Sequence, residues 1–209
     1  TRCHRVTGVQ TCALPIYRFL DASIKAKEMV DNNKLGKILQ GRVNVIWNRD
    51  IEYYENSQWR GKWATEGGGS LINQASHSID LLSWLMGDVD TVFGFWDKKI
   101  HKIEVDDNAC AVVKFKNGTF ATIATSTSAK PGYPAEVTII GSQGSISIDG
   151  NVLKHTKETG ETEIMDFDKG QVAMFNDPKV FSKKSHSRII QNFVEAVRNG
   201  TQPAVSGEE

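Results

Sequence analysis

The sequence lacks the features that mark several large protein classes. Its 25 Lys and Arg residues equal its 25 Asp and Glu residues, whereas a nucleic-acid binder usually carries a basic excess. No run reaches the 18 or more apolar residues of a membrane-spanning helix. The longest apolar stretch, Ile79–Met86, contains Asp80 and Ser83. We therefore expect a protein that binds neither nucleic acid nor membrane.

Cysteine is scarce as well. The three cysteines, Cys3, Cys12 and Cys110, form no CxxC pair, so neither a zinc ribbon nor a redox dithiol is indicated. Cys110 stands among small apolar residues in a strand-like segment, and we expect it to be buried. This usage fits a reducing compartment, so we expect a cytoplasmic protein.

Several motifs of catalysis and nucleotide binding are also absent. The sequence contains no GxGxxG dinucleotide fingerprint, no GxxxxGK[ST] phosphate loop and no GxSxG serine-hydrolase elbow. A metal site with His77 would need further ligands, and His101, His155 and His186 do not have the spacing to supply them. We therefore expect no bound metal.

What remains is the composition of an ordinary globular domain, with 209 residues, 39% hydrophobic and 24% charged. Apolar residues recur at helical spacing over 21–33, 70–86 and 187–199. Alternating patterns and turn residues indicate a strand over 38–49 and a run of hairpins between 89 and 167, one of them with its turn at Asn117-Gly118. Because the strands are grouped apart from the helices, the sequence predicts an α+β domain with a mostly antiparallel sheet.

The two ends of the chain do not fit this pattern. Thr1–Ile16 shows neither helical nor strand periodicity and is not a secretory signal. We interpret residues 1–16 as a non-native segment and residues 17–206 as one domain. The last residues, Ser206–Glu209, read as the start of a helix that does not continue, so we expect a domain truncated at both ends.

The segment Glu66–Asp80 (EGGGSLINQASHSID) is the main candidate for chemistry. On a helix, Asn73 and His77 would share one face, with Asp80 one turn further. Three glycines allow another chain or a ligand to approach the helix start, whose positive end favours an oxyanion or a charged cofactor group. The His77 imidazole suits proton transfer in a hydroxyl-to-carbonyl interconversion. The alternative is a core histidine bonded to Asn73 or Asp80.

Two further segments are rich in functional residue types. Trp59–Trp63 combines aromatic faces with Arg60, a combination that holds sugars or carboxylates. The alternative is a loop anchored by its tryptophans, with Arg60 in a structural ion pair. Glu104–Asp107 is acidic and could resemble a metal site, but we expect a solvated turn.

Taken together, the pattern GGGxLxNQxxHxID, the Trp59–Trp63 segment, Arg18–Phe19 and the following Ala26-Lys-Glu resemble the C-terminal domain of the glucose-fructose oxidoreductase / inositol dehydrogenase / rhizopine catabolism (Gfo/Idh/MocA) family. The resemblance covers residues 17 to 206. It implies an open, mostly antiparallel sheet with helices on one face, joined in the family to an N-terminal Rossmann domain that binds NAD or NADP.

The resemblance also implies roles for individual residues. His77 takes the position of the family's helix histidine, which moves the proton of the reacting oxygen, and Asn73 stands where many members have aspartate. Asparagine is not a base, so Asn73 would orient the substrate or His77. Arg60, Trp59, Trp63 and Gln74 are the candidate substrate-binding residues. The Rossmann domain, its cofactor-binding residues and the family's Glu-Lys-Pro lysine are missing from this sequence.

These implications predict the substrate-binding and oligomerisation domain of an NAD(P)-dependent dehydrogenase that acts on a sugar, polyol or nucleotide sugar. The partners expected are a small-molecule substrate and, through the sheet, further copies of the chain. Residues 1–209 alone are expected to be inactive. Two alternatives remain: a non-catalytic sugar-binding or assembly module of the same fold, and a metal-dependent lyase or isomerase that uses His77.

Overall fold

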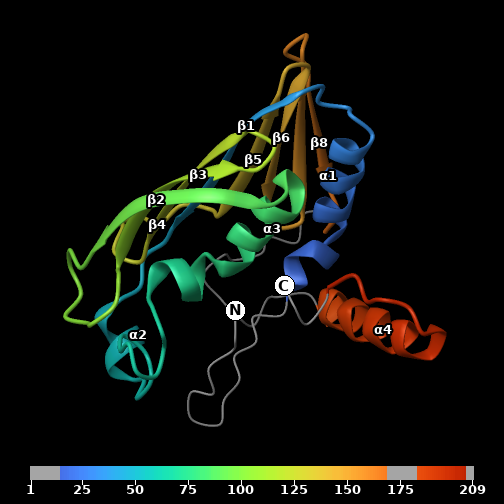
Figure 1. Ribbon diagram of the computed structural model, residues 1–209. Coiled ribbons are helices and arrows are strands. Elements are labelled where there is room, and N and C mark those ends of the chain that lie inside the picture. Colours follow the sequence, from blue (N-terminus) through green and yellow to red (C-terminus); the bar gives the residue numbers. More distant parts are fainter. Residues whose placement is uncertain (1–14, 169–182, 206–209) are drawn as a thin grey trace.

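A single eight-stranded sheet forms the frame of the structure, a computed structural model that describes residues 15–168 and 183–205 (Figure 1). The strand order is β2-β3-β4-β1-β5-β6-β7-β8, with β1 and β4 parallel and the other neighbours antiparallel. The predicted open, mostly antiparallel sheet is therefore confirmed. The strands are β1 (Ile38–Ile46), β2 (Val89–Asp97), β3 (Asn108–Phe115), β4 (Phe120–Ser126), β5 (Glu136–Gly141), β6 (Gly144–Asp149), β7 (Val152–Lys157) and β8 (Thr162–Asp166).

Local sequence explains the hairpins and the two-sided strands. Between β3 and β4, Gly118 takes a φ of +86°, and the Asn117 side chain accepts a hydrogen bond of 3.0 Å from the Thr119 amide, which closes the predicted Asn-Gly turn. Along β1, Gly41, Val43 and Val45 are buried, whereas Arg42, between Gly41 and Val43, is exposed. The period of two thus assigns one face of the sheet to the core.

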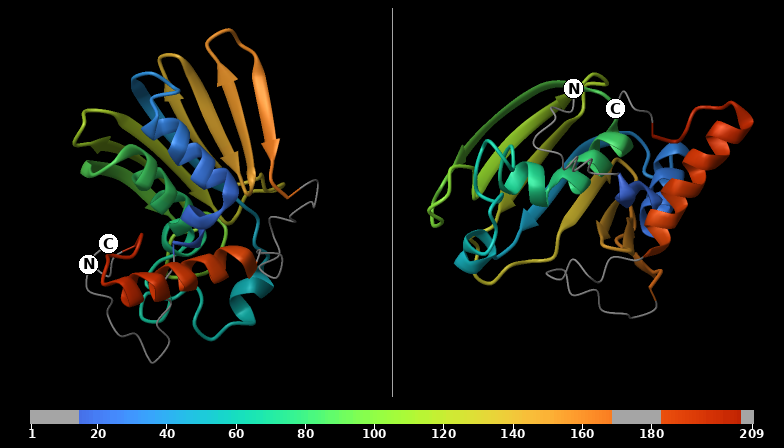
Figure 2. Two further views of the ribbon diagram at one scale, coloured as in Figure 1. Left: turned by 90° about the vertical axis from the view of Figure 1, so that its right-hand side faces the viewer. Right: turned by 90° about the horizontal axis from the view of Figure 1, so that it is seen from below.

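Three helical elements cover that face: α1 (Asp21–Asp31), the π-helical segment η2 (Ser70–Gln74) and α3 (Ser76–Met86). Figure 2 shows α1 and α3 lying across the same side of the sheet. At Gly41 of β1, a Cβ would lie 2.2 Å from the Met86 sulfur, so glycine allows α3 to approach the sheet closely. The core residues include Ala26, Leu35, Val43, Val45, Leu81, Leu82, Met86, Val113, Phe115, Ile123, Ile139, Ile146 and Leu153.

Three more helical elements lie at the ends of this layer: η1 (Ile16–Phe19), α2 (Ile51–Glu55) and α4 (Lys183–Asn199). Arg188 of α4 donates to Asp21 (2.7 Å) and to the Phe19 carbonyl (2.9 Å), which holds α4 beside η1. Ile16, which the sequence assigned to the non-native segment, is buried in η1. Residues 1–14 and 206–209 lie outside the described residues, and the domain boundaries stay predictions.

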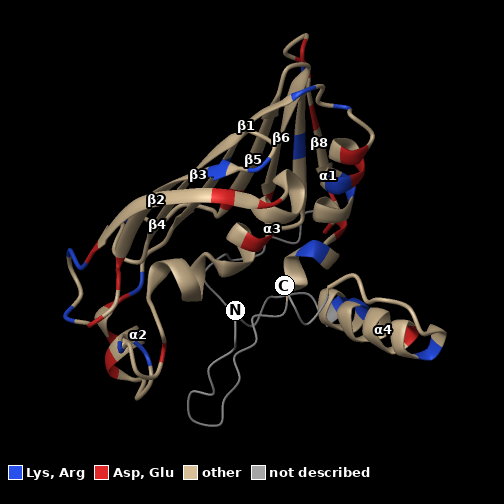
Figure 3. Ribbon diagram, in the orientation of Figure 1, with Lys and Arg blue, Asp and Glu red and all other residues tan. Residues whose placement is uncertain are grey.

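No helix covers the opposite face of the sheet among the described residues (Figures 1 and 2). Register places Cys110 of β3 beside Phe95 of β2 on this uncovered face, and Cys110 is an exposed free thiol. The prediction of a buried Cys110 is therefore wrong, because its small neighbours do not indicate which face is covered. β2 carries charged side chains only at Asp90 and Asp97, near its two ends (Figure 3).

None of the helices within residues 15–168 and 183–205 has the length and apolarity needed to cross a membrane.

Candidate functional site

The segment after the three glycines is a π-helical turn followed by an α-helix, where the sequence predicted one continuous helix. The Ala75 amide donates to the Ser70 carbonyl over 3.0 Å, an i to i+5 bond, and α3 begins at Ser76. π-helical turns are rare and occur frequently at functional sites. Asn73 and His77 therefore belong to two different elements, joined at Ala75.

A buried carboxylate from a distant loop holds this turn. Asp106 accepts hydrogen bonds from the Gly69 amide (2.8 Å), the Ser70 hydroxyl (2.6 Å) and the Leu71 amide (3.0 Å). A Cβ on Gly69 would lie 1.9 Å from the Asp106 carbonyl oxygen, so the glycine allows this close approach. The amides predicted to receive an oxyanion or a cofactor group already bind the protein's own carboxylate. The expectation of an open anion site at this helix start is therefore wrong.

The neighbouring Asp107 fixes a second loop. Its carboxylate accepts bonds from the amides of Lys99 (2.7 Å), Ile100 (2.9 Å) and His101 (2.9 Å). Burial acts to raise its pKa, but the backbone donors outweigh burial and hold the pKa below its usual value. Asp106 and Asp107 are both buried, so the solvated turn predicted for residues 104–107 is wrong: the two carboxylates organise the loops on either side.

Glu66, at the start of the motif, orients Asn73. The Asn73 amide nitrogen donates to one Glu66 oxygen, and the Gly61 backbone amide donates to the other. Burial raises the pKa of Glu66, although these two bonds and the charge of Arg60 oppose the rise. With its nitrogen committed to Glu66, Asn73 has its carbonyl oxygen left to receive a hydrogen bond from a ligand.

His77 is half-buried at the beginning of α3 and stacks on Tyr17 of η1, with ring centroids 4.8 Å apart. Asn73 bonds to Glu66, and Asp80 forms a bidentate pair with Arg18 at 2.9 and 2.6 Å. Neither of the partners named in the core-histidine alternative therefore bonds to the ring.

The protonation of His77 follows from the same surroundings. Burial lowers the pKa of His77, Asp80 acts to raise it, and His186 of α4 lowers it further. An imidazole with a pKa below its usual value of about 6.5 is neutral at pH 7 and can accept a proton.

Arg60 and Trp59 lie beside the motif through a shared tyrosine. Gln74 donates to the Tyr53 hydroxyl over 3.0 Å. The Arg60 guanidinium carbon lies 4.1 Å from the Tyr53 ring centre and 4.7 Å from that of Trp59, within cation–π distance of both. The structure thus brings Arg60, Trp59 and Gln74 together. Trp63 instead makes an edge contact of 5.5 Å with Trp96 of β2.

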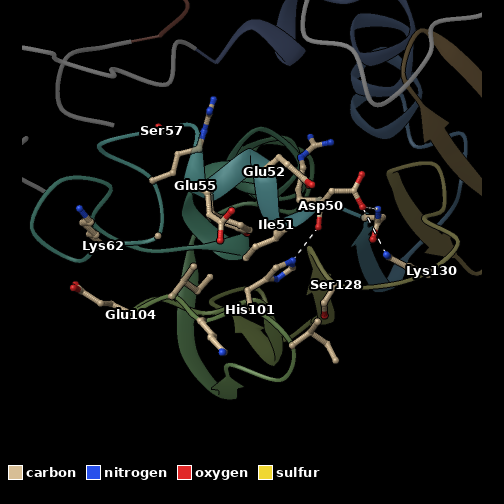
Figure 4. A pocket seen from close by; sticks show the side chains of 18 residues that line it. Asp50, Ile51, Glu52, Glu55, Ser57, Lys62, His101, Glu104, Ser128 and Lys130 are labelled. Atoms are coloured by element: carbon tan, nitrogen blue, oxygen red, sulfur yellow. Dashed lines mark hydrogen bonds and ion pairs between the residues drawn. The ribbon is translucent and has the colours of Figure 1, made fainter.

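A cavity of about 1190 Å³ opens on the Arg60 side of this cluster (Figure 4). Its walls come from α2, the loop after it and the loop 100–104 that Asp107 helps to hold. The Tyr54 hydroxyl donates to Thr127 over 2.8 Å, and the His101 ring lies 2.9 Å from the Arg49 carbonyl, so both walls are fixed to neighbouring elements.

Four site residues were missed by sequence reasoning: Tyr17, Tyr53, Glu66 and Asp106. Glu66 stood inside the motif, and a carboxylate seven residues before an asparagine gave no local reason for pairing. The other three belong to the site through tertiary contacts, which the spacing of residues in the sequence does not predict. No group of three or more His, Cys, Asp or Glu able to hold a metal occurs within the described residues.

Comparison with known proteins places this fold in a family. Residues 23–147 match the family model of the GFO/IDH/MocA C-terminal domain. Among curated proteins, myo-inositol 2-dehydrogenase of Thermotoga maritima is 29% identical over 195 residues, covering 88% of this chain and 53% of that protein. The scyllo-inositol 2-dehydrogenase (NAD(+)) of Bacillus subtilis is 24% identical over 196 residues, covering 90% of this chain and 53% of that protein.

Comparison with a solved dehydrogenase structure shows the same fold. The WlbA dehydrogenase of Bordetella pertussis, in complex with NADH and UDP-GlcNAcA, superposes with a TM-score of 0.73 at 26% identity, covering 94% of this chain and 55% of that one. The fold is an α+β domain that superposes on about half of this dehydrogenase structure. The chain belongs to the GFO/IDH/MocA family. It spans about half the length of these relatives.

Proposed function

We propose that the chain is the substrate-binding and oligomerisation domain of an NAD(P)-dependent oxidoreductase that acts on a sugar, polyol or nucleotide sugar. The relatives support this class, since they include two inositol dehydrogenases and an enzyme in complex with NADH and UDP-GlcNAcA. When bound, the nicotinamide accepts or supplies the hydride. The described residues do not fit the dinucleotide by themselves, because Asp106 occupies the helix start that could receive a pyrophosphate. The cofactor is assigned to a domain outside this chain.

The main structural support for this proposal is the environment of His77. Its ring is half-buried, its nitrogens make no hydrogen bond within the described residues, and burial lowers its pKa. A neutral imidazole in this state accepts the proton of a substrate hydroxyl as the hydride leaves, and returns it in the reverse reaction. Asn73 cannot exchange a proton, so its free carbonyl oxygen orients the hydroxyl.

The remaining roles concern binding. Gln74 positions Tyr53, and Arg60 and Trp59 offer a cation and an aromatic face to the substrate. Trp63 is 47% exposed beside Trp96 and offers a second aromatic face. We propose that Arg60, Trp59, Trp63 and Gln74 form the substrate-binding part of the site.

Association through the uncovered face of the sheet completes the proposal. Register aligns Phe93 with Val112 and Phe95 with Cys110 there, and Phe120 lies on β4 beside them. Phe93 and Phe95 are 66% and 74% exposed, and an apolar patch of this kind marks an interaction surface. We assign it to a second copy of the chain, and we place the protein in the cytoplasm, where a thiol such as Cys110 stays reduced.

The test uses the complete gene that contains this domain. The purified product is assayed for NADH or NADPH formation with inositols, other polyols and UDP-sugars. We expect turnover, and we expect His77→Ala to lower kcat by about 10² or more because it removes the proton acceptor. His155→Ala, on β7, is the matched control and should retain activity.

Two outcomes would contradict the proposal. Full kcat in the His77→Ala variant removes the proposed role of the imidazole. Sugar binding without turnover by the complete protein favours a non-catalytic module instead. Residues 1–209 alone should show no turnover, since the sequence contains no dinucleotide fingerprint.

A further inference from the structure

Arg60 is a cation without an anionic partner in the part of the chain that the structure describes. No carboxylate oxygen there lies within 4.0 Å of its guanidinium nitrogens, and its Nε is buried without a hydrogen-bond partner. The charge of Arg60 acts on the Glu66 carboxylate, whose pKa it lowers. Both Glu66 oxygens, however, are already bonded to Gly61 and Asn73. The structural ion pair offered as the alternative for Arg60 is therefore not formed.

The side chain is nevertheless held in place. Its guanidinium lies against the Tyr53 and Trp59 rings, and Tyr53 is fixed by Gln74. Stacking on aromatic faces leaves the in-plane N–H groups of arginine free to bind an oxyanion, and it restricts the rotamers that binding would otherwise have to order. The terminal nitrogens are not among the buried unpaired atoms, and the residue lines the large cavity.

The charges around the cavity do not cancel this cation. Asp50 lies 3.7 Å from Lys130, and Glu104 accepts the Trp63 amide over 3.0 Å. Figure 4 shows Asp50 and Lys130 on one side of the cavity and Lys62 and Glu104 on the other. Among the residues that the structure describes, the Lys62 ammonium donates only to the Gln58 carbonyl, at 3.4 Å, and so adds positive charge. The remaining lining carboxylates, Glu52 and Glu55, are exposed on α2.

We propose that Arg60, clamped by Tyr53 and Trp59, forms an anion subsite for a phosphate or carboxylate carried by the non-reacting part of the substrate. This proposal rests on the proposed function and narrows it: substrates with an oxyanion group are preferred over neutral sugars and polyols. The helix start at Gly69–Leu71 does not compete for that group because Asp106 already fills it.

Calorimetric titration of residues 1–209 with two matched pairs of ligands tests the subsite. The pair UDP and uridine isolates a phosphate source, and the pair D-glucuronate and D-glucose isolates a carboxylate source. We expect the charged member of at least one pair to bind about tenfold or more tightly than the neutral member, as for a charge-assisted bidentate contact. The pair that discriminates identifies the source, and the preference should weaken with added salt.

Variants assign the effect to the residue. Arg60→Gln should reduce the charged-to-neutral ratio to about one, and Arg60→Lys should give an intermediate ratio, since it keeps the charge and loses the planar fork. Arg42→Gln, on the exposed side of β1, is the control and should keep the full ratio. Circular dichroism confirms that each variant is folded.

The proposal is overturned if neither charged ligand binds saturably, if wild type does not discriminate within either pair, or if Arg60→Gln discriminates as wild type does. Because the titration involves neither NAD nor hydride transfer, His77→Ala should leave the ratio unchanged. A complete enzyme that oxidises neutral polyols as readily as charged sugars would contradict the subsite while leaving the proposed function intact.

Discussion

The two faces of the sheet carry apolar side chains of similar kind in opposite surroundings. On the face toward α1 and α3, Val43, Phe115 and Ile139 are at most 1% exposed. On the other face, Phe93 and Phe95 are more than half exposed. Alternation along each strand determines which side chains share a face. What covers that face depends on the rest of the chain, or on another molecule.

β2 makes the contrast sharper because it extends beyond the helical layer. Val92 and Trp96 alternate with Phe93 and Phe95, so they point to the helical side of the sheet, yet they are 58% and 53% exposed. An edge contact with the Trp63 ring covers part of Trp96. Within the described residues, β2 therefore contributes pairing to β3 and little to the core. Substitutions of apolar residues in β2 should therefore reduce the free energy of unfolding much less than substitutions of core residues in β3.

The largest expected difference is between two phenylalanines. Phe115→Ala should reduce the free energy of unfolding by about 3–5 kcal/mol, because it leaves a cavity in the core. Phe93→Ala should change it by about 0.5 kcal/mol or less at protein concentrations where the chain is monomeric. Urea unfolding followed by circular dichroism measures both. Equal losses would mean that the uncovered face is buried in the folded monomer.

A polar pair tests the same contrast in the loops. Asp106→Asn replaces an acceptor of three hydrogen bonds by a group with two donors, so buried amides of the π-helical turn lose partners. We expect a loss of about 2–3 kcal/mol. Asp90→Asn, which breaks an exposed pair with Lys114, is the control and should cost less than about 1 kcal/mol. A small loss in the free energy of unfolding for Asp106→Asn would show that the π-helical turn is stable without the hydrogen bonds to Asp106.

Local patterns were sufficient for most of the frame. The Asn117-Gly118 turn and the alternation along β1 predicted their elements because backbone preference and period act over a few residues. The π-helical turn at 70–74 escaped prediction, since its geometry depends on Asp106, which follows about 35 residues later in the chain. The exposure of Cys110 escaped for a similar reason: only the placement of α1 and α3 decides which side of β3 is covered.

In the candidate site, too, local sequence predicted some features and others depend on tertiary structure. The motif placed Asn73 and His77 near each other, and the structure adds their surroundings: Glu66 for the amide and Tyr17 for the ring. Gln74 and Arg60 were named from two separate segments, and only the fold shows that Tyr53 joins them. Sequence therefore identified residue types at the site, while their pairing required tertiary structure.

Association is the next test, with a smaller expected change in free energy. Phe95→Lys places a charge in the proposed contact of the uncovered face and should weaken self-association about tenfold or more. Light scattering coupled to size exclusion measures the mass as a function of concentration. In parallel, alkylation of Cys110, which pairs with Phe95, should be slower in the oligomer than in the variant. Lys25→Glu, exposed on α1 over the covered face of the sheet, is the control. A monomeric wild type at all concentrations would exclude this interface.

The smallest expected effect concerns Asp149 at the end of β6. Burial raises its pKa to about 6, with Lys154 opposing and Glu136 adding to the rise, and its Oδ1 is buried without a hydrogen-bond partner. The folded protein thus holds this proton more tightly than the unfolded chain, whose carboxyl has a pKa near 3.8. The free energy of unfolding contributed by Asp149 is therefore fully present below about pH 4 and decreases as the pH rises to about 6.

Asp149→Asn should remove that decrease and stabilise the protein by about 1 kcal/mol at pH 7, a value reduced to allow for the partial solvent exposure of the group. Urea unfolding of wild type and variant at pH 4, 5 and 7 isolates the effect, since other groups titrate alike in both. A difference between the two that does not change with pH would mean that the carboxyl is solvated in the folded state. Partial burial at the end of β6 would then have little effect on the pKa of Asp149, just as the sheet gives little burial to the apolar side chains of β2.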